Sequence, residues 1–154
     1  MSKRIVVPSL VGAVVVGAIA AGGIAMAADP APTEPTLENS SARYVARSSS
    51  DGGGAGSLTF TTDVRDDSGV RGLKVLAWPA SSKLDPTEAE LRSVESATCR
   101  GTSDGTSRCT YTLKVTEKEA AGLDQGTWYV SARATAKDGG TAFVPRAATF
   151  DVRR

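Results

Sequence analysis

Two cysteines, Cys99 and Cys109, are the residues whose chemistry is easiest to interpret. A redox role needs a closely spaced pair such as Cys-x-x-Cys, and the nine residues between these two do not supply one. In an oxidising compartment an even number of cysteines favours a disulfide. The intervening residues are rich in glycine, serine, threonine and aspartate, which is typical of a reversing loop. We therefore expect a disulfide, and if two adjacent antiparallel strands carry the cysteines it would staple a hairpin.

The segment from Arg100 to Arg108 lies between these cysteines and is the one segment that could act as a presented loop. A pre-organised loop loses little entropy on binding, and arginine is a residue that a trypsin-like protease accepts. A protease inhibitor is therefore one hypothesis for the function. The simpler interpretation is a solvent-exposed hairpin with no inhibitory role.

Catalytic residues are scarce. The chain has no histidine, which excludes serine-histidine triads, histidine zinc sites and haem ligation. A phosphate loop and a dinucleotide fingerprint are also missing. The pairs Glu88 with Glu90 and Glu117 with Glu119 are two residues apart, so on a helix they point to different faces and favour caps over a hydrolase pair. We expect no enzyme and no cofactor.

Two further kinds of site can be considered. Five aspartates fall at expected strand ends and turns, where they could gather around calcium: Asp63, Asp66, Asp67, Asp104 and Asp138. The chain has no Asp-x-Asp-x-Asp-Gly loop, and aspartate is a routine turn former, so we expect no metal site. Five aromatic residues could line a sugar-binding platform, with Tyr129 as the best exposed candidate: Tyr44, Trp78, Tyr111, Trp128 and Tyr129. A carbohydrate-binding accessory module is thus a third hypothesis.

The amino terminus predicts export. Lys3 and Arg4 precede a charge-free run from Ile5 to Ile24, and Ala25-Met26-Ala27 fits the pattern that signal peptidase reads. Residues 1–27 are therefore interpreted as a signal peptide and the product as secreted or cell-wall associated. The run is also long enough to cross a bilayer, so an uncleaved membrane anchor is the alternative.

Length and charge limit the remaining possibilities. The 154 residues leave room for one ordinary domain after the signal segment. Cleavage removes two of the 18 basic residues and none of the 17 acidic ones, so the mature net charge is −1. A nucleic-acid or anionic-membrane binder would need clustered lysine and arginine, so neither partner is expected.

The mature chain divides into a linker and a domain. Residues 28–56 are rich in proline, serine and glycine and are expected to be a linker, with 28–41 a spacer and 43–48 a strand at the edge of a sheet or more linker. Residues 57–154 are expected to form the folded domain. A helix of two to three turns is expected from Asp85 to about Val94, because Asp85-Pro86 and Glu88 form a helix-start pattern. Thr116 with Glu119 repeats the capping-box spacing and opens one more turn, which Gly122 can close.

Period-2 alternation predicts strands in this domain. Apolar residues alternate with polar ones over 58–64, 109–115 and 128–136, and a last strand covers 148–152. The stretch from Val70 to Trp78 has apolar groups on both faces, which predicts a central strand. Such short strands separated by turns imply an all-β antiparallel sandwich of six or seven strands. The expected large core members are Phe60, Leu73, Trp78, Leu113, Trp128 and Phe150.

Three segments carry a family resemblance. Asp66 to Val70 leading into Leu73-Lys74-Val75, then Leu123 to Val130, then Ala148 to Val152 resemble the strands and turns of bacterial immunoglobulin-like domains. From about Leu58 onward the chain is also similar to small secreted actinobacterial proteins of unassigned function. The resemblance implies an immunoglobulin-like β-sandwich outside the cytoplasm and supplies no catalytic residue. Cys99 and Cys109 depart from antibody-type domains, because they are too close in sequence to join the two sheets.

Together these observations predict an exported, non-enzymatic immunoglobulin-like module with a binding or structural role. An extracellular protein and a cell-wall glycan are the candidate partners. After signal cleavage no membrane association is expected.

Overall fold

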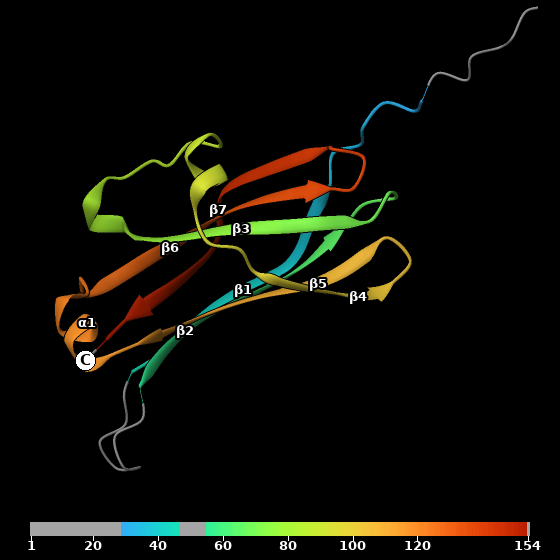
Figure 1. Cartoon of the computed structure of the whole chain (residues 1–154). Helices are drawn as coiled ribbons and strands as arrows, with labels where there is room; N and C mark the ends of the chain where they lie inside the picture. Colours follow the sequence, from blue (N-terminus) through green and yellow to red (C-terminus); the bar gives the residue numbers. More distant parts are fainter. Residues whose placement is uncertain (1–28, 47–54, 154) are drawn as a thin grey trace, which may run out of the picture. The chain divides into compact units, whose positions relative to one another are not determined.

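Seven strands lie in two antiparallel sheets in a computed structural model that describes residues 29–46 and 55–153 (Figure 1). The expected signal peptide and the glycine run at 52–54 lie outside the described residues. In the first sheet the order is β1 (Thr36–Val45), β2 (Gly56–Arg65), β5 (Thr106–Val115) and β4 (Thr98–Ser103). In the second sheet it is β3 (Val70–Pro79), β6 (Gly126–Ala136) and β7 (Thr141–Val152).

This strand order is the one found in constant-type immunoglobulin domains, with four strands in one sheet and three in the other. The expected all-β antiparallel sandwich with short helical turns is therefore confirmed. Alternate residues of both sheets point inward and form one core. Its buried members are Leu58, Phe60, Val64, Leu73, Val75, Cys109, Val130, Ala132, Ala134, Phe150 and Val152.

The first strand begins earlier than expected. β1 starts at Thr36, so the spacer interpretation of 28–41 is wrong for residues 36–41. Pairing with β2 is interrupted by a bulge between Glu38 and Ser41, where Asn39 has a positive φ of 52°. Buried Thr62 of β2 donates to the Glu38 carbonyl oxygen at 3.0 Å, so this core hydroxyl is satisfied. The bulge and the polar sequence of β1 hide the alternation that identifies the other strands.

The third strand is not central, as its sequence suggested, but lies at the edge of its sheet. Its inner face packs against the first sheet, and its outer face is covered by the crossover, residues 80–97, that leads to β4. Trp78 on that outer face is buried and donates from Nε1 to Oγ of Ser131 at 2.9 Å. Leu91 of the crossover is also fully buried. β3 is therefore apolar on both faces because the crossover covers its outer face. It does not lie in the middle of a sheet.

The expected helix from Asp85 to Val94 is wrong. The crossover contains only two single-turn 3-10 helices, η1 (Ala80–Ser82) and η2 (Glu90–Ser93). Thr87 and Glu90 bond reciprocally, two residues later than the expected start, with the Thr87 N–H donating to Glu90 Oε2 at 2.8 Å. Glu88 instead reaches the sheet, where Arg133 donates to its carboxylate at 2.9 Å.

The second helix start is confirmed. α1 spans Glu117–Gly122, and Thr116 and Glu119 form a reciprocal capping box at its amino end. This single turn carries the chain from β5 to β6, and Leu123, at its carboxyl end, packs against the core. Local hydrogen bonding alone is enough to fix this turn.

Candidate functional site

An apolar cleft of about 360 Å³ opens between the two sheets where the sandwich is incompletely closed. The first sheet contributes the inward-facing side chains Tyr44, Leu58, Tyr111, Leu113 and Val115. The second sheet contributes Val75, Leu76, Ala77, Trp128, Phe150 and Val152, and the rest of the lining is Ser93, Val94, Glu95 and Leu123. A concave site with mostly apolar walls and few polar groups is the usual form of a ligand pocket.

The cleft exists because β4 is shorter than β5. β4 pairs with β5 only as far as Thr98 opposite Thr110, so Tyr111 to Val115 continue without it. The chain before β4 pairs instead with β3, where the Ala97 N–H donates to the Leu73 carbonyl oxygen at 2.8 Å. As a result Leu113, an expected core residue, is 42% exposed although it points to the inside of the sandwich.

One polar contact lies at the rim. The Tyr111 hydroxyl donates to Oε2 of Glu95 at 2.5 Å. Burial, and then the hydrogen bond and charge of Glu95, raise the pKa of Tyr111 to about 12. Both effects disfavour the phenolate, so the hydroxyl stays protonated and the cleft keeps one hydrogen-bonding group beside its apolar walls.

Alkaline titration tests this contact. Because the folded-state pKa of Tyr111 is raised above the ordinary value of 10, its contribution to stability is complete below pH 10 and is lost as the pH rises toward 12. We expect one of the three tyrosines to ionise near pH 12, as followed by phenolate absorbance. Glu95→Gln should lower that midpoint, and Tyr111→Phe should remove the late step. A late step that survives in Tyr111→Phe would contradict the assignment.

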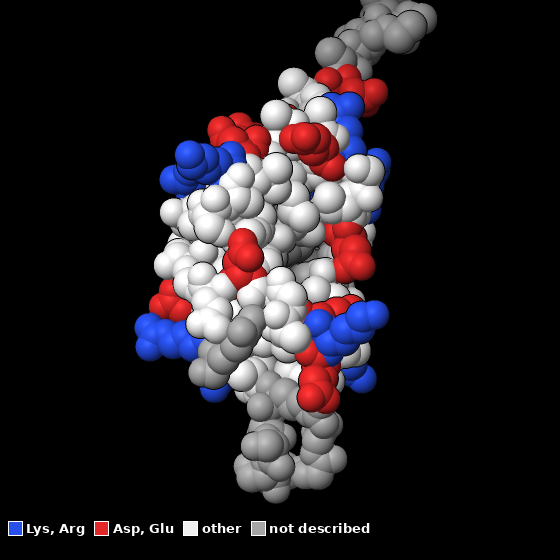
Figure 2. All heavy atoms as spheres, turned by 90° about the vertical axis from the view of Figure 1, so that its left-hand side faces the viewer, with Lys and Arg blue, Asp and Glu red and all other residues white. Residues whose placement is uncertain are grey.

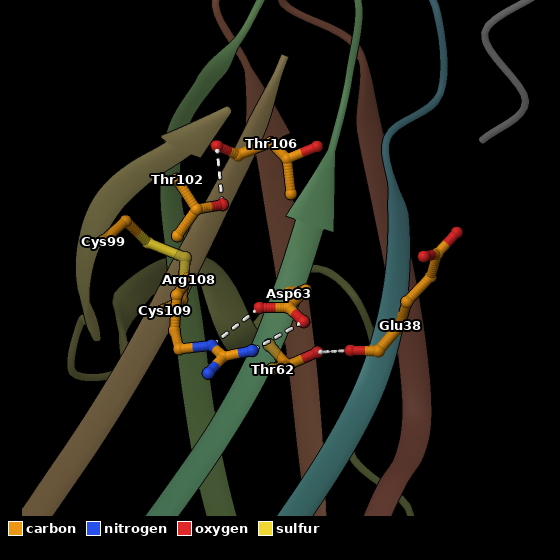
Figure 3. The surroundings of a disulfide bond; sticks show 8 residues. All are labelled: Glu38, Thr62, Asp63, Cys99, Thr102, Thr106, Arg108 and Cys109. Atoms are coloured by element: carbon orange, nitrogen blue, oxygen red, sulfur yellow. Dashed lines mark hydrogen bonds and ion pairs between the residues drawn. A yellow bond between two sulfur atoms is a disulfide. The ribbon is translucent and has the colours of Figure 1, made fainter. Parts of the chain in front are cut away.

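The two cysteines lie directly opposite each other on β4 and β5 and form a disulfide, with their Cα atoms 4.0 Å apart (Figure 3). Arg100 and Arg108 are the next cross-strand pair, so both are held within a regular hairpin. Only Asp104 and Gly105 form the turn, and the Gly105 carbonyl oxygen accepts from the Asp66 N–H at 2.8 Å. The segment expected as a possible presented loop is thus a paired hairpin with an anchored turn.

Arg108 bonds to a neighbouring strand. Its Nε and an Nη donate to the two carboxylate oxygens of Asp63 at 2.8 and 3.0 Å (Figure 3). The hydrogen bond from Arg108 and a second one from Asn39 lower the pKa of Asp63 to about 2. This bidentate pair links β2 to β5 on the outer face of the first sheet.

Acid titration tests this ion pair. Because the pKa of Asp63 is depressed from its ordinary value of 3.8, its contribution to stability is present above about pH 4 and is lost as the pH falls toward 2. Asp63→Asn should cause a small decrease in melting temperature at pH 7, and this difference should shrink between pH 4 and 2. Asp67→Asn, in the exposed turn that follows, is the control. An unchanged difference at pH 2 would show that charge is not the cause.

The other candidate residues do not assemble into a site. Among the described residues no group of three or more histidine, cysteine, aspartate or glutamate side chains could hold a metal ion. Asp66 and Asp138 bind Thr33 and so fasten the segment before β1. Glu90 and Glu119 are capping residues, and the hydrogen bonds from Thr87 and Thr116 lower the pKa of each. Glu88 also has a lowered pKa, mainly because Arg133 bonds to it.

The aromatic candidates separate into two groups. Tyr129 does not stand free on the surface, because its ring lies 4.8 Å from that of Trp78 and the Arg146 guanidinium lies 4.6 Å from its centroid. Tyr44, Tyr111 and Trp128 instead meet in the cleft. Glu95 and Leu123 also line the cleft, and neither was predicted from the sequence as a site residue. The only sequence signal for the cleft was the large apolar Leu113 near the end of an alternating strand.

The face of the molecule in Figure 2 has no patch of one charge. On the face in Figure 2 acidic and basic side chains are interspersed around uncharged surface, and no block of one sign appears. No helix in the described part of the chain is long and apolar enough to cross a membrane.

Fold and cleft together define a protein class: a seven-stranded sandwich with the constant-type immunoglobulin strand order and an apolar pocket between its sheets. The chain belongs to a family of unknown function (DUF5707), whose model matches residues 37–134. The matched region includes β1 apart from Thr36, all of β2 to β5, the disulfide, and most of β6. No curated protein and no solved structure matches the chain.

Proposed function

We propose that this chain is an exported, non-catalytic immunoglobulin-like module that binds an apolar part of its ligand in the cleft between the sheets. The observation that carries the proposal is the cleft itself, a concavity of about 360 Å³ whose walls come from both sheets. Tyr111 and Glu95 give it one polar contact at the rim, which is the combination that orients a bound ligand.

Export is supported by the order of residues at the amino terminus and by the disulfide. A basic pair, an apolar run and Ala25-Met26-Ala27 form a signal-peptide pattern. The bond between Cys99 and Cys109 fits an oxidising compartment. An actinobacterial origin and attachment to the cell wall also belong to this proposal. They are supported by the family resemblance alone.

The two alternative functions have less support. A protease inhibitor needs a loop that projects into an active site, whereas Arg100 and Arg108 sit in paired strands. A sugar platform needs an exposed aromatic face, whereas Tyr129 is packed between Trp78 and Arg146. Tyr44, Tyr111 and Trp128, the other sugar-platform candidates that reach the cleft, lie there among mostly apolar side chains.

Binding of the fluorescent probe anilinonaphthalene sulfonate tests the proposal. We expect saturable binding of one equivalent to the folded protein at neutral pH. Leu113→Asp places a carboxylate in the apolar wall and should weaken binding about tenfold or more. Leu84→Asp is the matched control, because Leu84 is 45% exposed and Leu113 is 42% exposed, but Leu84 does not line the cleft.

Two results would overturn the proposed function. Absence of saturable probe binding, or equal binding by the two variants, would remove the cleft as a binding site. Hydrolytic turnover by the purified protein on a polymer substrate would remove the non-catalytic assignment.

A further inference from the structure

One edge of β5, beside the cleft, has backbone groups with no partner strand in the described part of the chain. β5 pairs with β2 along its whole length, from Thr106 opposite Arg65 to Val115 opposite Gly56. On the other side β4 covers it only up to Thr110. Among the described residues, Tyr111 to Val115 therefore form a sheet edge five residues long.

The disulfide fixes which backbone groups face this edge. Cross-strand pairs in antiparallel sheets alternate between hydrogen-bonded pairs, with Cα atoms about 5.5 Å apart, and non-hydrogen-bonded pairs, about 4.5 Å apart. At 4.0 Å, Cys99 and Cys109 are a non-hydrogen-bonded pair. Even-numbered residues of β5 therefore direct their N–H and C=O toward the β4 side. Beyond Thr110 these are Thr112 and Lys114, whose outward N–H and C=O groups have no backbone partner among residues 29–46 and 55–153.

The same alternation places the side chains. Tyr111, Leu113 and Val115 point into the cleft, and Thr112 and Lys114 lie on the outer face of the sheet. An antiparallel strand added along this edge would exchange hydrogen bonds with Thr112 and Lys114. Its alternate side chains, opposite Tyr111, Leu113 and Val115, would enter the cleft and cover the exposed part of Leu113.

Other edges of the two sheets carry features that oppose such pairing. β1 has a bulge, β4 is only six residues long, and β7 contains Pro145. The free side of β3 is paired with Glu95 to Ala97, and the strand ends at Pro79. The β2–β5 register has no bulge, and no proline occurs in Tyr111–Val115. Of the described edges, this one is the best suited to accept a strand.

We propose that the ligand of the cleft is an extended peptide segment that adds to β5 as an antiparallel strand, in line with β4, with apolar residues at alternate positions. This inference rests on the proposed function and specifies its partner. Main-chain hydrogen bonds would supply affinity, and the cleft would select apolar side chains at every second position.

The test uses the protein expressed from the 154-residue sequence and a nine-residue peptide in which valine alternates with threonine between terminal lysines. We expect saturable binding, together with slower amide exchange at Thr112 and Lys114. A scrambled peptide of the same composition should bind at least about tenfold more weakly, because it cannot place valine at alternate positions. Leu113→Asp should weaken binding similarly and Leu84→Asp should not.

Methylating the peptide backbone tests the strand register without any change to the protein. In the antiparallel register the threonine amides face Thr112 and Lys114, and the valine amides face solvent. Methylating the threonine amides should weaken binding by about tenfold or more, and methylating the valine amides should have little effect. Equal effects of the two methylations, or a greater effect at the valine amides, would overturn the antiparallel register.

The remaining outcomes separate this inference from the proposed function. If anilinonaphthalene sulfonate binds the cleft but the alternating peptide does not, the strand inference fails and the apolar cleft remains a binding site. If neither binds, the proposed function fails as well. Protection of Ala77 on β3 instead of Thr112 and Lys114, or self-association of the protein through this edge, would also overturn the peptide strand.

Discussion

Leu91→Ala is expected to lower the free energy of unfolding by about 2–5 kcal/mol. Leu91 is fully buried although it lies on a single 3-10 turn in the crossover. It is not part of the main core between the sheets, so its burial comes from docking on the second sheet, where η2 contacts β3 and β6. A truncation at such a site loses transfer free energy and leaves a cavity.

Hydrogen bonds also hold the crossover to the rest of the domain. Arg133 donates to Glu88, Lys74 donates to the Val94 carbonyl oxygen, and Glu95 and Ala97 pair with β3. None of these bonds replaces the apolar burial of Leu91. Trp78 is buried on the outer face of β3, so loosening of the crossover should shift its fluorescence to longer wavelength under native conditions.

Chemical denaturation of Leu91→Ala and Leu84→Ala measures the effect. Leu84 lies in the same crossover but is 45% exposed, so its truncation should cost no more than about 0.5 kcal/mol. A cost below about 1 kcal/mol for Leu91→Ala would mean that the crossover is not docked on the sheet.

Strands with one buried face could be identified from sequence because their signal is local. Leu58, Phe60, Thr62 and Val64 alternate with polar residues, and all four are buried. The same holds for the alternating alanines of β6. Such a pattern can be recognised without knowing the pairing partners. It arises wherever one face of a sheet is buried and the other faces water.

The failures share a different cause, namely contacts between distant segments. Asp85-Pro86 has good helix-start chemistry, but Glu88 and Leu91 gain more from the sheet, through the bond with Arg133 and through burial, than a short exposed helix offers. β1 was missed over 36–41 because its bulge depends on Asn39 and on the Thr62 hydroxyl of another strand.

The cleft could not be predicted because it depends on where one strand ends relative to another. Some of its residues, Leu113 and Tyr111 among them, were named from sequence as core or aromatic candidates. β4 begins only at Thr98, because Ala97 before it pairs with Leu73 of β3. Leu113 is therefore left uncovered. The sequence of β5 contains no local pattern from which that pairing could be predicted.

Removing the disulfide by Cys99→Ala with Cys109→Ala is expected to lower the free energy of unfolding by about 2.5–3 kcal/mol. The sequence separation of 10 closes a loop of about 11 residues, and the chain-entropy estimate for such a loop gives this value. That is a large fraction of the roughly 5–15 kcal/mol that stabilises an ordinary domain.

The effect should be concentrated on β4. All of its side chains except Cys99 are exposed, so apart from backbone pairing the disulfide is its main attachment to β5. We expect amide exchange in β4 to accelerate in the double variant, while exchange in β2 and β6 changes little under native conditions. Chemical reduction of the wild-type protein, which keeps both sulfur atoms in place, separates the loss of the cross-link from the loss of side-chain volume.

Loss of β4 would also lengthen the open edge of β5. Arg108 and Thr110 share the parity of Thr112 and Lys114, so their N–H and C=O groups, which face β4 in the intact hairpin, would become open in the reduced protein. The alternating peptide should then protect Arg108 and Thr110 in addition to Thr112 and Lys114. Uniform acceleration of exchange across both sheets would instead show that the disulfide stabilises the sandwich globally and that β4 does not separate on its own.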